Sequence, residues 1–105
     1  MEDQMLGYKL LLTYELKDGV TPEYYQFVMG RYVPVLHSMG LQMSEVWQTA
    51  YGNAPNRLIG FVCQEQATIN EVLASENWTT LNEELKSFVS DLSYKVIPYR
   101  GGFQI

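Results

Sequence analysis

The sequence predicts one α+β domain, residues 1–105, with elements in the order strand, helix, strand, strand, helix, strand. Three features support this prediction: runs of aromatic and aliphatic residues typical of strands, helix-start sequences between them, and turn residues at their ends. A chain of 105 residues holds a single core, and 47% hydrophobic with 18% charged residues is typical of a folded protein.

The first strand is predicted over residues 8–16, YKLLLTYEL, because this apolar run ends at a turn. The Thr-Pro-Glu sequence at 21–23 then predicts a helix with the threonine as its N-cap. Pro34 has no N–H to bond back to Gly30, so we expect a kink there, and Gly40 ends the helix.

Two strands are predicted next, over 41–51 and 57–64, with turn residues at 52–56 between them. The Thr-Ile-Asn-Glu sequence at 68–71 is a capping box, which predicts a second helical region. Together with the first strand and helix, these elements leave the end of the chain for the rest of this helical region and one further strand.

The second helical region is expected to break briefly near Ser75 and then to continue. Its continuation is predicted from apolar residues at helical spacing, namely Trp78, Leu81, Leu85, Phe88, Val89 and Leu92. The last strand is predicted over 94–100, with Pro98 at a sheet edge or bulge. This order defines a ferredoxin-like βαββαβ fold, a four-stranded antiparallel sheet with the helices on one face.

The central strands are apolar on both faces. The first places Leu12 on one face and Leu11 on the other, and the third does the same with Val62 and Phe61. Helices cover one face only, and a monomer rarely exposes a large apolar patch. We therefore expect a homodimer in which a second copy covers the open face and closes an α+β barrel.

Composition argues against nucleic acid and membrane partners. RLIGFVCQ at 57–64 is similar to an RNA-binding submotif, but only Phe61 of its stacking aromatics is present. The net charge is −5 and the seven Lys and Arg are scattered singly, which leaves no basic patch for phosphates. The acidic start MEDQM is unlike a signal peptide and no apolar run is long enough to span a membrane, so we expect a cytoplasmic protein.

The chain resembles the dimeric α+β barrel superfamily and, within it, the NIPSNAP-like group. The shared motifs are Thr13-Tyr14-x-Leu16-Lys17-x-Gly19, Tyr32-x-Pro34, Trp47-x-Thr49-x-x-Gly52, Asn56 and Trp78. The resemblance implies two βαββαβ sheets packed as a barrel around a central cavity. It also implies kinship with cofactor-free monooxygenases, haem-degrading enzymes, small cyclases and proteins without known activity.

Four positions depart from the pattern of this group. Leu10 and Leu12 replace a Glu and an Arg of its first strand, whereas Gly60 and Val62 replace a His and a Trp of its third. Each change removes a polar or aromatic side chain, which leaves the expected cavity poorly equipped for acid–base catalysis.

The expected ligand-binding residues lie on three strands and at the chain's end: Leu12, Tyr14, Glu45, Trp47, Gly60, Val62 and Arg100. We expect Leu10, Leu12 and Tyr14 to line the cavity with Leu58, Gly60 and Val62, and Gly60 to leave a gap for a small apolar ligand. The competing expectation is that Trp47 or a partner side chain already fills that gap.

The roles of three of these residues are open from sequence. Glu45 is either a base among apolar neighbours or an edge charge paired with an arginine. Trp47 is either core or a stacking surface for a ligand. Arg100 either reaches a ligand at the mouth of the barrel or binds a carboxylate of the partner chain, and the partner contact is favoured.

No metal, haem or other cofactor is expected. The single histidine, His37, is predicted on the outer side of its helix, and residues 68–92 lack the histidine of the haem-degrading relatives. The single cysteine, Cys63, is expected to be a buried and inert thiol, and Arg31 to extend along the core with its head in water.

Two hypotheses of function follow. The first is a dimeric barrel that binds a small apolar molecule without chemistry. The alternative is a cofactor-free monooxygenase or cyclase acting on an aromatic polyketide-like substrate, with catalytic residues unknown.

Overall fold

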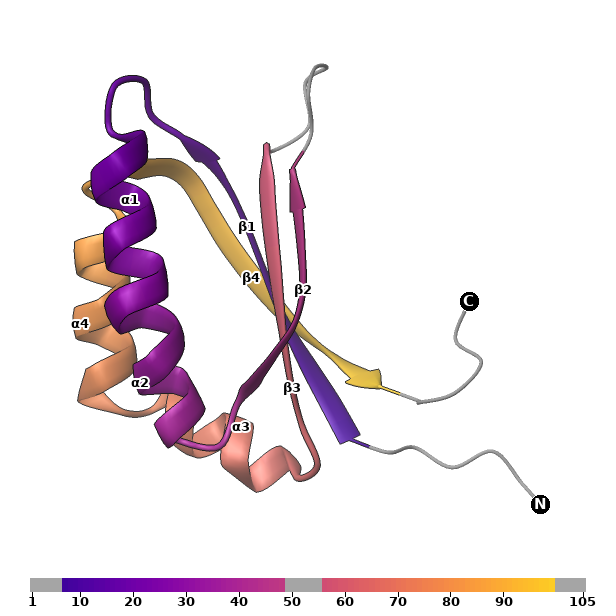
Figure 1. Cartoon of the computed structure of the whole chain (residues 1–105). Helices are drawn as coiled ribbons and strands as arrows, with labels where there is room; N and C mark the ends of the chain where they lie inside the picture. Colours follow the sequence, from indigo (N-terminus) through magenta and orange to yellow (C-terminus); the bar gives the residue numbers. More distant parts are fainter. Residues whose placement is uncertain (1–6, 49–55, 100–105) are drawn as a thin grey trace.

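The computed structural model describes residues 7–48 and 56–99, which form a four-stranded antiparallel sheet with helices packed on one face (Figure 1). The strands lie in the order β2-β3-β1-β4, so β1 and β3 are central. This arrangement confirms the predicted ferredoxin-like α+β fold. In chain order the elements are β1 (Gly7–Leu16), α1 (Thr21–Phe27), η1 (Val28–Tyr32), α2 (Val33–Ser38), β2 (Gln42–Gln48), β3 (Arg57–Cys63), α3 (Gln66–Leu73), α4 (Glu76–Leu85) and β4 (Val89–Tyr99).

The first helical region contains a π-helical turn, η1, just before Pro34. The N–H of Val33 donates to the carbonyl of Val28, five residues back instead of four. Pro34 has no N–H for the carbonyl of Gly30, and its ring needs room there, so a wider turn accommodates it. The disturbance predicted at Pro34 is therefore a π-helical turn within a continuous helical region.

The ends of this helical region were predicted to within one residue. The N-cap is Val20 and makes no side-chain capping bond, so the prediction that the threonine of 21–23 caps the helix is wrong. Gly40 ends the region as predicted: its φ is +104°, a value that favours glycine, and Leu41 N–H donates to Leu36 at 3.0 Å.

The strands β2 and β3 form a hairpin within the sheet. The strand predicted over 57–64 is β3, and β2 accounts for residues 42–48 of the strand predicted over 41–51. Residues 49–55, which hold the rest of that strand and most of the predicted turn, lie outside the described part of the chain.

The second helical region starts earlier than predicted and breaks where predicted. Its N-cap is Glu65, without a side-chain capping bond, so the capping box at 68–71 is wrong; those residues lie inside α3. The break at Ser75 is confirmed: its hydroxyl accepts from Trp78 N–H at 3.1 Å and caps α4.

The last strand also begins earlier, at Val89, and the helix predicted to continue to Leu92 ends at Leu85. The pairing of β4 with β1 shifts register between Thr13 and Glu15, and Asp91 opposite has a φ of +56°. This bulge breaks the alternation of the strand. The apolar residues on either side of it are therefore spaced as in a helix, which explains the wrong prediction.

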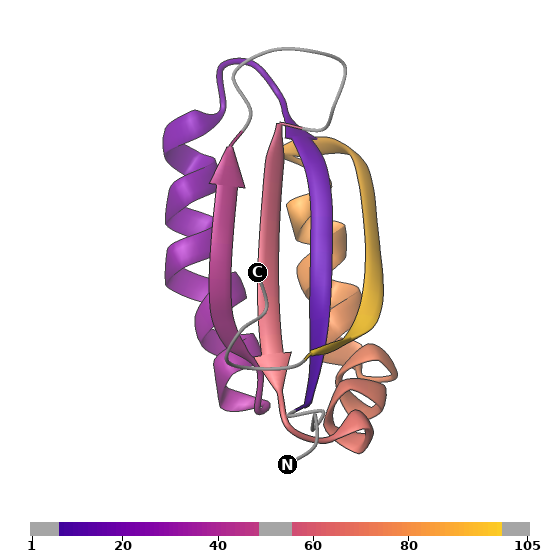
Figure 2. The same ribbon diagram turned by 90° about the vertical axis from the view of Figure 1, so that its right-hand side faces the viewer.

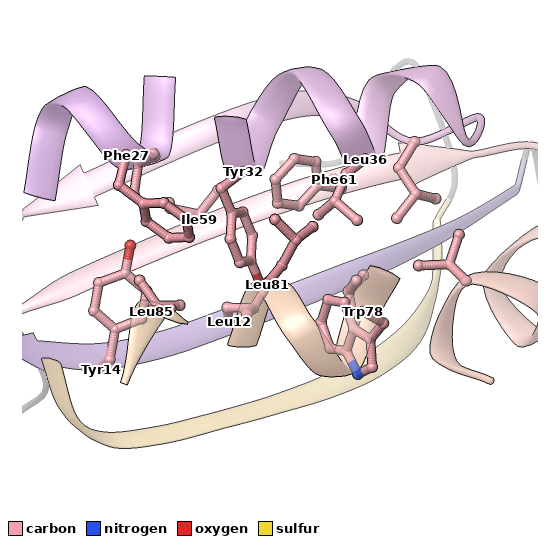
Figure 3. Packing of buried hydrophobic residues seen from close by; sticks show 14 of the residues in the cluster. Leu12, Tyr14, Phe27, Tyr32, Leu36, Ile59, Phe61, Trp78, Leu81 and Leu85 are labelled. Carbon is pink, nitrogen blue, oxygen red and sulfur yellow. The ribbon is translucent and has the colours of Figure 1, made fainter. Parts of the chain in front are cut away.

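The core lies between the helices and the sheet, as Figure 3 shows. It is rich in aromatic rings: Tyr32 packs near Phe61 and Trp78, and its hydroxyl donates to Asn82 at 2.8 Å. Trp78 is buried, as the sequence predicted. The other buried residues labelled in the figure are Leu12, Tyr14, Phe27, Leu36, Ile59, Leu81 and Leu85.

Candidate functional site

The candidate site is the face of the sheet that carries no helix, which we call the open face (Figure 2). Cross-strand partners in an antiparallel sheet share a face, so the register assigns each side chain to one side. The residues of the open face are Lys9, Leu11 and Thr13 from β1, Gln42, Glu45 and Trp47 from β2, Leu58, Gly60 and Val62 from β3, and Ser93, Lys95 and Ile97 from β4.

The open face is apolar over much of its area. Its four aliphatic side chains are only partly covered and do not belong to the core: Leu11, Leu58, Val62 and Ile97. Trp47 is 63% exposed, although it is the largest side chain on this face. No described segment of the chain covers these residues, so their apolar surface is available to a partner or ligand.

An ion pair lies in the middle of this apolar surface. Lys9 Nζ lies 3.2 Å from Glu45 Oε1, and the two side chains are 16% and 32% exposed. Of the two alternatives for Glu45, the structure shows a paired charge, but its partner is Lys9 and not the expected arginine. Lys9 was not among the predicted site residues, because its contact with Glu45 depends on a bulge in β2.

The bulge in β2 also determines which side chains lie next to Gly60. The register of β2 against β3 shifts between Met43 and Glu45, which sets Glu45 opposite Gly60. A Cβ atom on Gly60 would lie 3.0 Å from Glu45 Cγ and 3.1 Å from Leu11 Cδ2. The predicted empty gap at Gly60 is therefore wrong: Glu45 and Leu11 fill it, and neither Trp47 nor a partner chain is needed.

A shallow hollow of about 260 Å³ lies on the β4 side of the open face. Leu11 and Leu58 form its apolar wall. Thr13 Oγ1 and Ser93 Oγ, which lie 3.1 Å apart, supply a hydroxyl pair. Tyr94 and Lys95 also line the hollow, which is large enough for part of a small molecule.

Leu12 and Tyr14 do not belong to this site. They pair with Ile59 and Arg57, on the helix-covered side, and both are buried in the core. The prediction that they share a face with Gly60 is wrong, because Gly60 pairs with Leu11 and side chains alternate along a strand. Glu45, Trp47, Gly60 and Val62 do share one face.

The remaining predicted residues lie away from this face or outside the description. Arg100 is outside the described residues. His37 is exposed near the end of α2, as expected. Arg31 is exposed and lies 3.2 Å from Glu84. Cys63 is partly buried, and burial raises the pKa of its thiol, which agrees with the expectation of an inert cysteine.

The described residues contain neither a metal-binding cluster nor a membrane-spanning helix. Within 7–48 and 56–99 there is no group of three or more His, Cys, Asp or Glu placed to hold a metal ion. None of the described helices is long and apolar enough to cross a membrane.

The fold and its open face define a class of small α+β proteins with a four-stranded sheet covered on one side. No family model matches the sequence, and no curated protein matches it. Solved structures do match. A NIPSNAP family protein of unknown function from Agrobacterium tumefaciens superposes with a TM-score of 0.67 and 13% identity, over 97% of this chain and 96% of the other.

Two further structures extend this similarity. A NIPSNAP-like domain protein from Burkholderia xenovorans gives a TM-score of 0.68 at 10% identity, over 97% and 91% of the two chains. A Nitrosomonas europaea protein, provisionally assigned as an antibiotic biosynthesis monooxygenase, gives 0.67 at 12% identity, over 99% and 98%. The NIPSNAP-like fold expected from the sequence motifs is therefore confirmed, and these identities support the fold alone.

Proposed function

We propose that this protein is a homodimer whose open faces pack together and hold a small, largely apolar molecule between them. One observation carries the proposal: the open face presents Leu11, Leu58, Val62 and Ile97 with an exposed Trp47, outside the core and uncovered by any described segment. Apolar surface of this kind is stabilised by removal from water, at about 25 cal/mol per Å².

The properties of the open face favour a second copy of the chain as the molecule that covers it. A twofold axis brings the same apolar side chains against each other, and interfaces of this type are self-complementary. It would also cover the Lys9–Glu45 pair, which is already neutralised internally and so does not oppose burial as a lone charge would. The predicted contact of Arg100 with the partner chain belongs to this proposal.

The chemical type of the ligand is inferred from the polar groups that lie among the apolar side chains of the open face. The filled space at Gly60 excludes binding there, so the ligand lies over the hollow lined by Leu11, Leu58, Thr13 and Ser93. Trp47 offers a flat apolar surface on the same face. These surroundings favour a molecule with an apolar body and one hydrogen-bonding end.

Native mass spectrometry of gently purified protein tests both parts of the proposal. The expected spectrum shows a dimer that carries a small molecule, and the small molecule is lost in Trp47→Ala. Met29→Ala is the matched control, because Met29 is an exposed apolar side chain of the helical region, and it should retain the molecule. A dimer without any bound molecule under all conditions would contradict the proposed ligand binding but not the proposed dimer.

A second candidate function is cofactor-free oxygenase or cyclase chemistry on an aromatic polyketide-like substrate. It is favoured by Trp47 and Glu45 on one face, a stacking surface beside a carboxylate, and by the fold shared with the Nitrosomonas europaea protein. Here the substrate supplies the reactivity and the protein positions it. Oxygen consumption or ring closure with such a substrate, lost in Glu45→Gln, distinguishes this function from binding alone.

A further inference from the structure

The helix-covered side of the sheet contains a buried arginine without a counter-ion. Arg57 begins β3 and is only 9% exposed. The described carboxylates that form ion pairs contact Lys9, Arg31 and Lys86, and none contacts Arg57. Removing a guanidinium from water is costly unless an acceptor or anion compensates it.

The hydrogen bonds of Arg57 leave one edge of its guanidinium group free. Nη1 donates to the carbonyl of Asn56 at 3.1 Å. Nη2 reaches the hydroxyl of Tyr25 at 3.5 Å, which is long for a hydrogen bond, and the buried Nε has no acceptor among the described residues. Nε and Nη2 form the edge of the guanidinium that binds both oxygens of a carboxylate.

Two aromatic rings lie near the guanidinium group of Arg57. Arg57 Cζ lies 6.0 Å from the centre of the Tyr24 ring, and the rings of Tyr24 and Tyr25 meet edge to face at 5.0 Å. The hydroxyls of Tyr24 and Tyr14 are 2.6 Å apart and hydrogen-bonded. Burial raises the pKa of Tyr14, which keeps this phenol neutral and unable to serve as a counter-ion.

Tyr25 is the exposed ring beside Arg57. Its side chain is 44% exposed and contacts the guanidinium through the long contact to Nη2. A rotation of Tyr25 toward solvent would free Nη2 for another acceptor, whereas Tyr24 is held by its hydrogen bond to Tyr14.

We propose that Arg57, with Tyr24 and Tyr25 beside it, binds the carboxylate group of a small planar organic acid. The two carboxylate oxygens accept from Nε and Nη2 and displace the hydroxyl of Tyr25. The flanking rings favour an aromatic or otherwise flat acid over a small inorganic anion. This site lies on the opposite side of the sheet from the open face, so it is independent of the function proposed above.

The test is a titration of the ¹⁵N-labelled protein with sodium benzoate at pH 7, followed by NMR through the Arg57 Nε–Hε signal. Sodium chloride and sodium phosphate at matched ionic strength are run in parallel. We expect a saturable shift of the Arg57 signal with benzoate only. Arg57→Met should weaken benzoate binding about tenfold or more, as the loss of a charge-assisted pair implies.

Two variants sharpen the result. Tyr25→Phe removes the hydroxyl that competes for Nη2 and should bind benzoate at least as tightly as the wild type. Arg31→Met removes an exposed arginine that already pairs with Glu84, and should leave binding unchanged. If Arg57→Met does not fold, the response of the wild-type Arg57 Nε–Hε signal to benzoate still tests the proposal.

Two outcomes would overturn the proposal. The first is an Arg57 signal that does not respond to benzoate, and the second is a response of equal strength to phosphate, which would mean unspecific anion binding.

Discussion

The two faces of the sheet differ in what covers their apolar side chains, although both belong to the same strands. On one face Leu12, Ile59 and Phe61 are sealed by the helices and packed into a continuous core. On the other face, Leu11 and Leu58 belong to the neighbouring strands β1 and β3, and no described segment covers them. Apolar side chains on both sides of the central strands are therefore the basis of the proposal that another molecule covers the open face.

The polar groups of the two faces also differ. On the helix-covered side the hydroxyls of Tyr14 and Tyr24 form a buried pair beside the buried guanidinium of Arg57. On the open face the polar groups are an ion pair, a hydroxyl pair and the exposed Lys95, and they remain at least partly accessible. The buried phenol pair belongs to the core of one chain, whereas the accessible groups of the open face suit a surface that meets a ligand or a second copy.

The largest expected effect is on the core. Phe61→Ala removes a fully buried ring and should lower the free energy of unfolding by about 3–5 kcal/mol. Val62→Ala, the next residue on the open face, should cost clearly less. Urea unfolding at one fixed protein concentration measures both. Equal losses would mean that the two faces are packed to the same extent within the chain.

Gly60→Leu should have the next largest effect. Because Glu45 and Leu11 occupy the space above Gly60, the new side chain overpacks it and separates Lys9 from Glu45. We expect a loss of about 1–3 kcal/mol in the free energy of unfolding. A stabilised Gly60→Leu protein would instead show that the space is open, as the sequence alone suggested.

The buried phenols predict a loss of stability at high pH. Burial raises the pKa of Tyr14 in the folded state above its ordinary value of 10.0. Its contribution is therefore present below about pH 10 and is lost as the pH rises further, because the unfolded chain releases the proton first. Tyr14→Phe should flatten the fall in unfolding free energy between pH 10 and 11 by up to about 1.4 kcal/mol per pH unit. An unchanged slope would place the phenol in contact with water.

The smallest expected effect is at Gly30, which lies in the helical region and, unlike Gly60, has free space where a Cβ atom would lie. No heavy atom lies within 4 Å of a Cβ placed there, so Gly30→Ala adds a methyl group without a clash. A helical Gly→Ala change should raise the free energy of unfolding by about 0.5–1 kcal/mol. Destabilisation, measured in the same urea experiments, would indicate that the π-helical turn before Pro34 requires glycine.

The order of the elements could be predicted from local patterns, because strands, caps and breakers each depend on a few neighbouring residues. The Ser75 break and the Gly40 helix end are examples. The site could not be predicted as well, because two bulges change the register. The bulge in β2 sets Glu45 opposite Gly60, and the bulge in β4 lets that strand extend back to Val89. A bulge depends on the partner strand, which the sequence of one segment does not reveal.

The assignment of Leu12 and Tyr14 to the site failed for a related reason. Alternation shows which residues of one strand share a face, but only the pairing of Leu12 with Ile59 tells which face of β3 joins them. Lys9 was not predicted as part of the site either. Its importance follows from Glu45, whose position depends on the β2 bulge.

Sedimentation velocity of the wild type and Leu58→Asp tests the central claim, that a second copy covers the open face. We predict a wild-type dimer at micromolar concentration, with an interface near the standard size of about 1,600 Å². Leu58→Asp, which places a charge in that face, should sediment as a folded monomer with an unchanged circular dichroism spectrum. Asn70→Asp, a charge on the exposed surface of α3, should remain a dimer. A wild type that is monomeric at micromolar concentration, or a Leu58→Asp protein that stays dimeric, would contradict the claim.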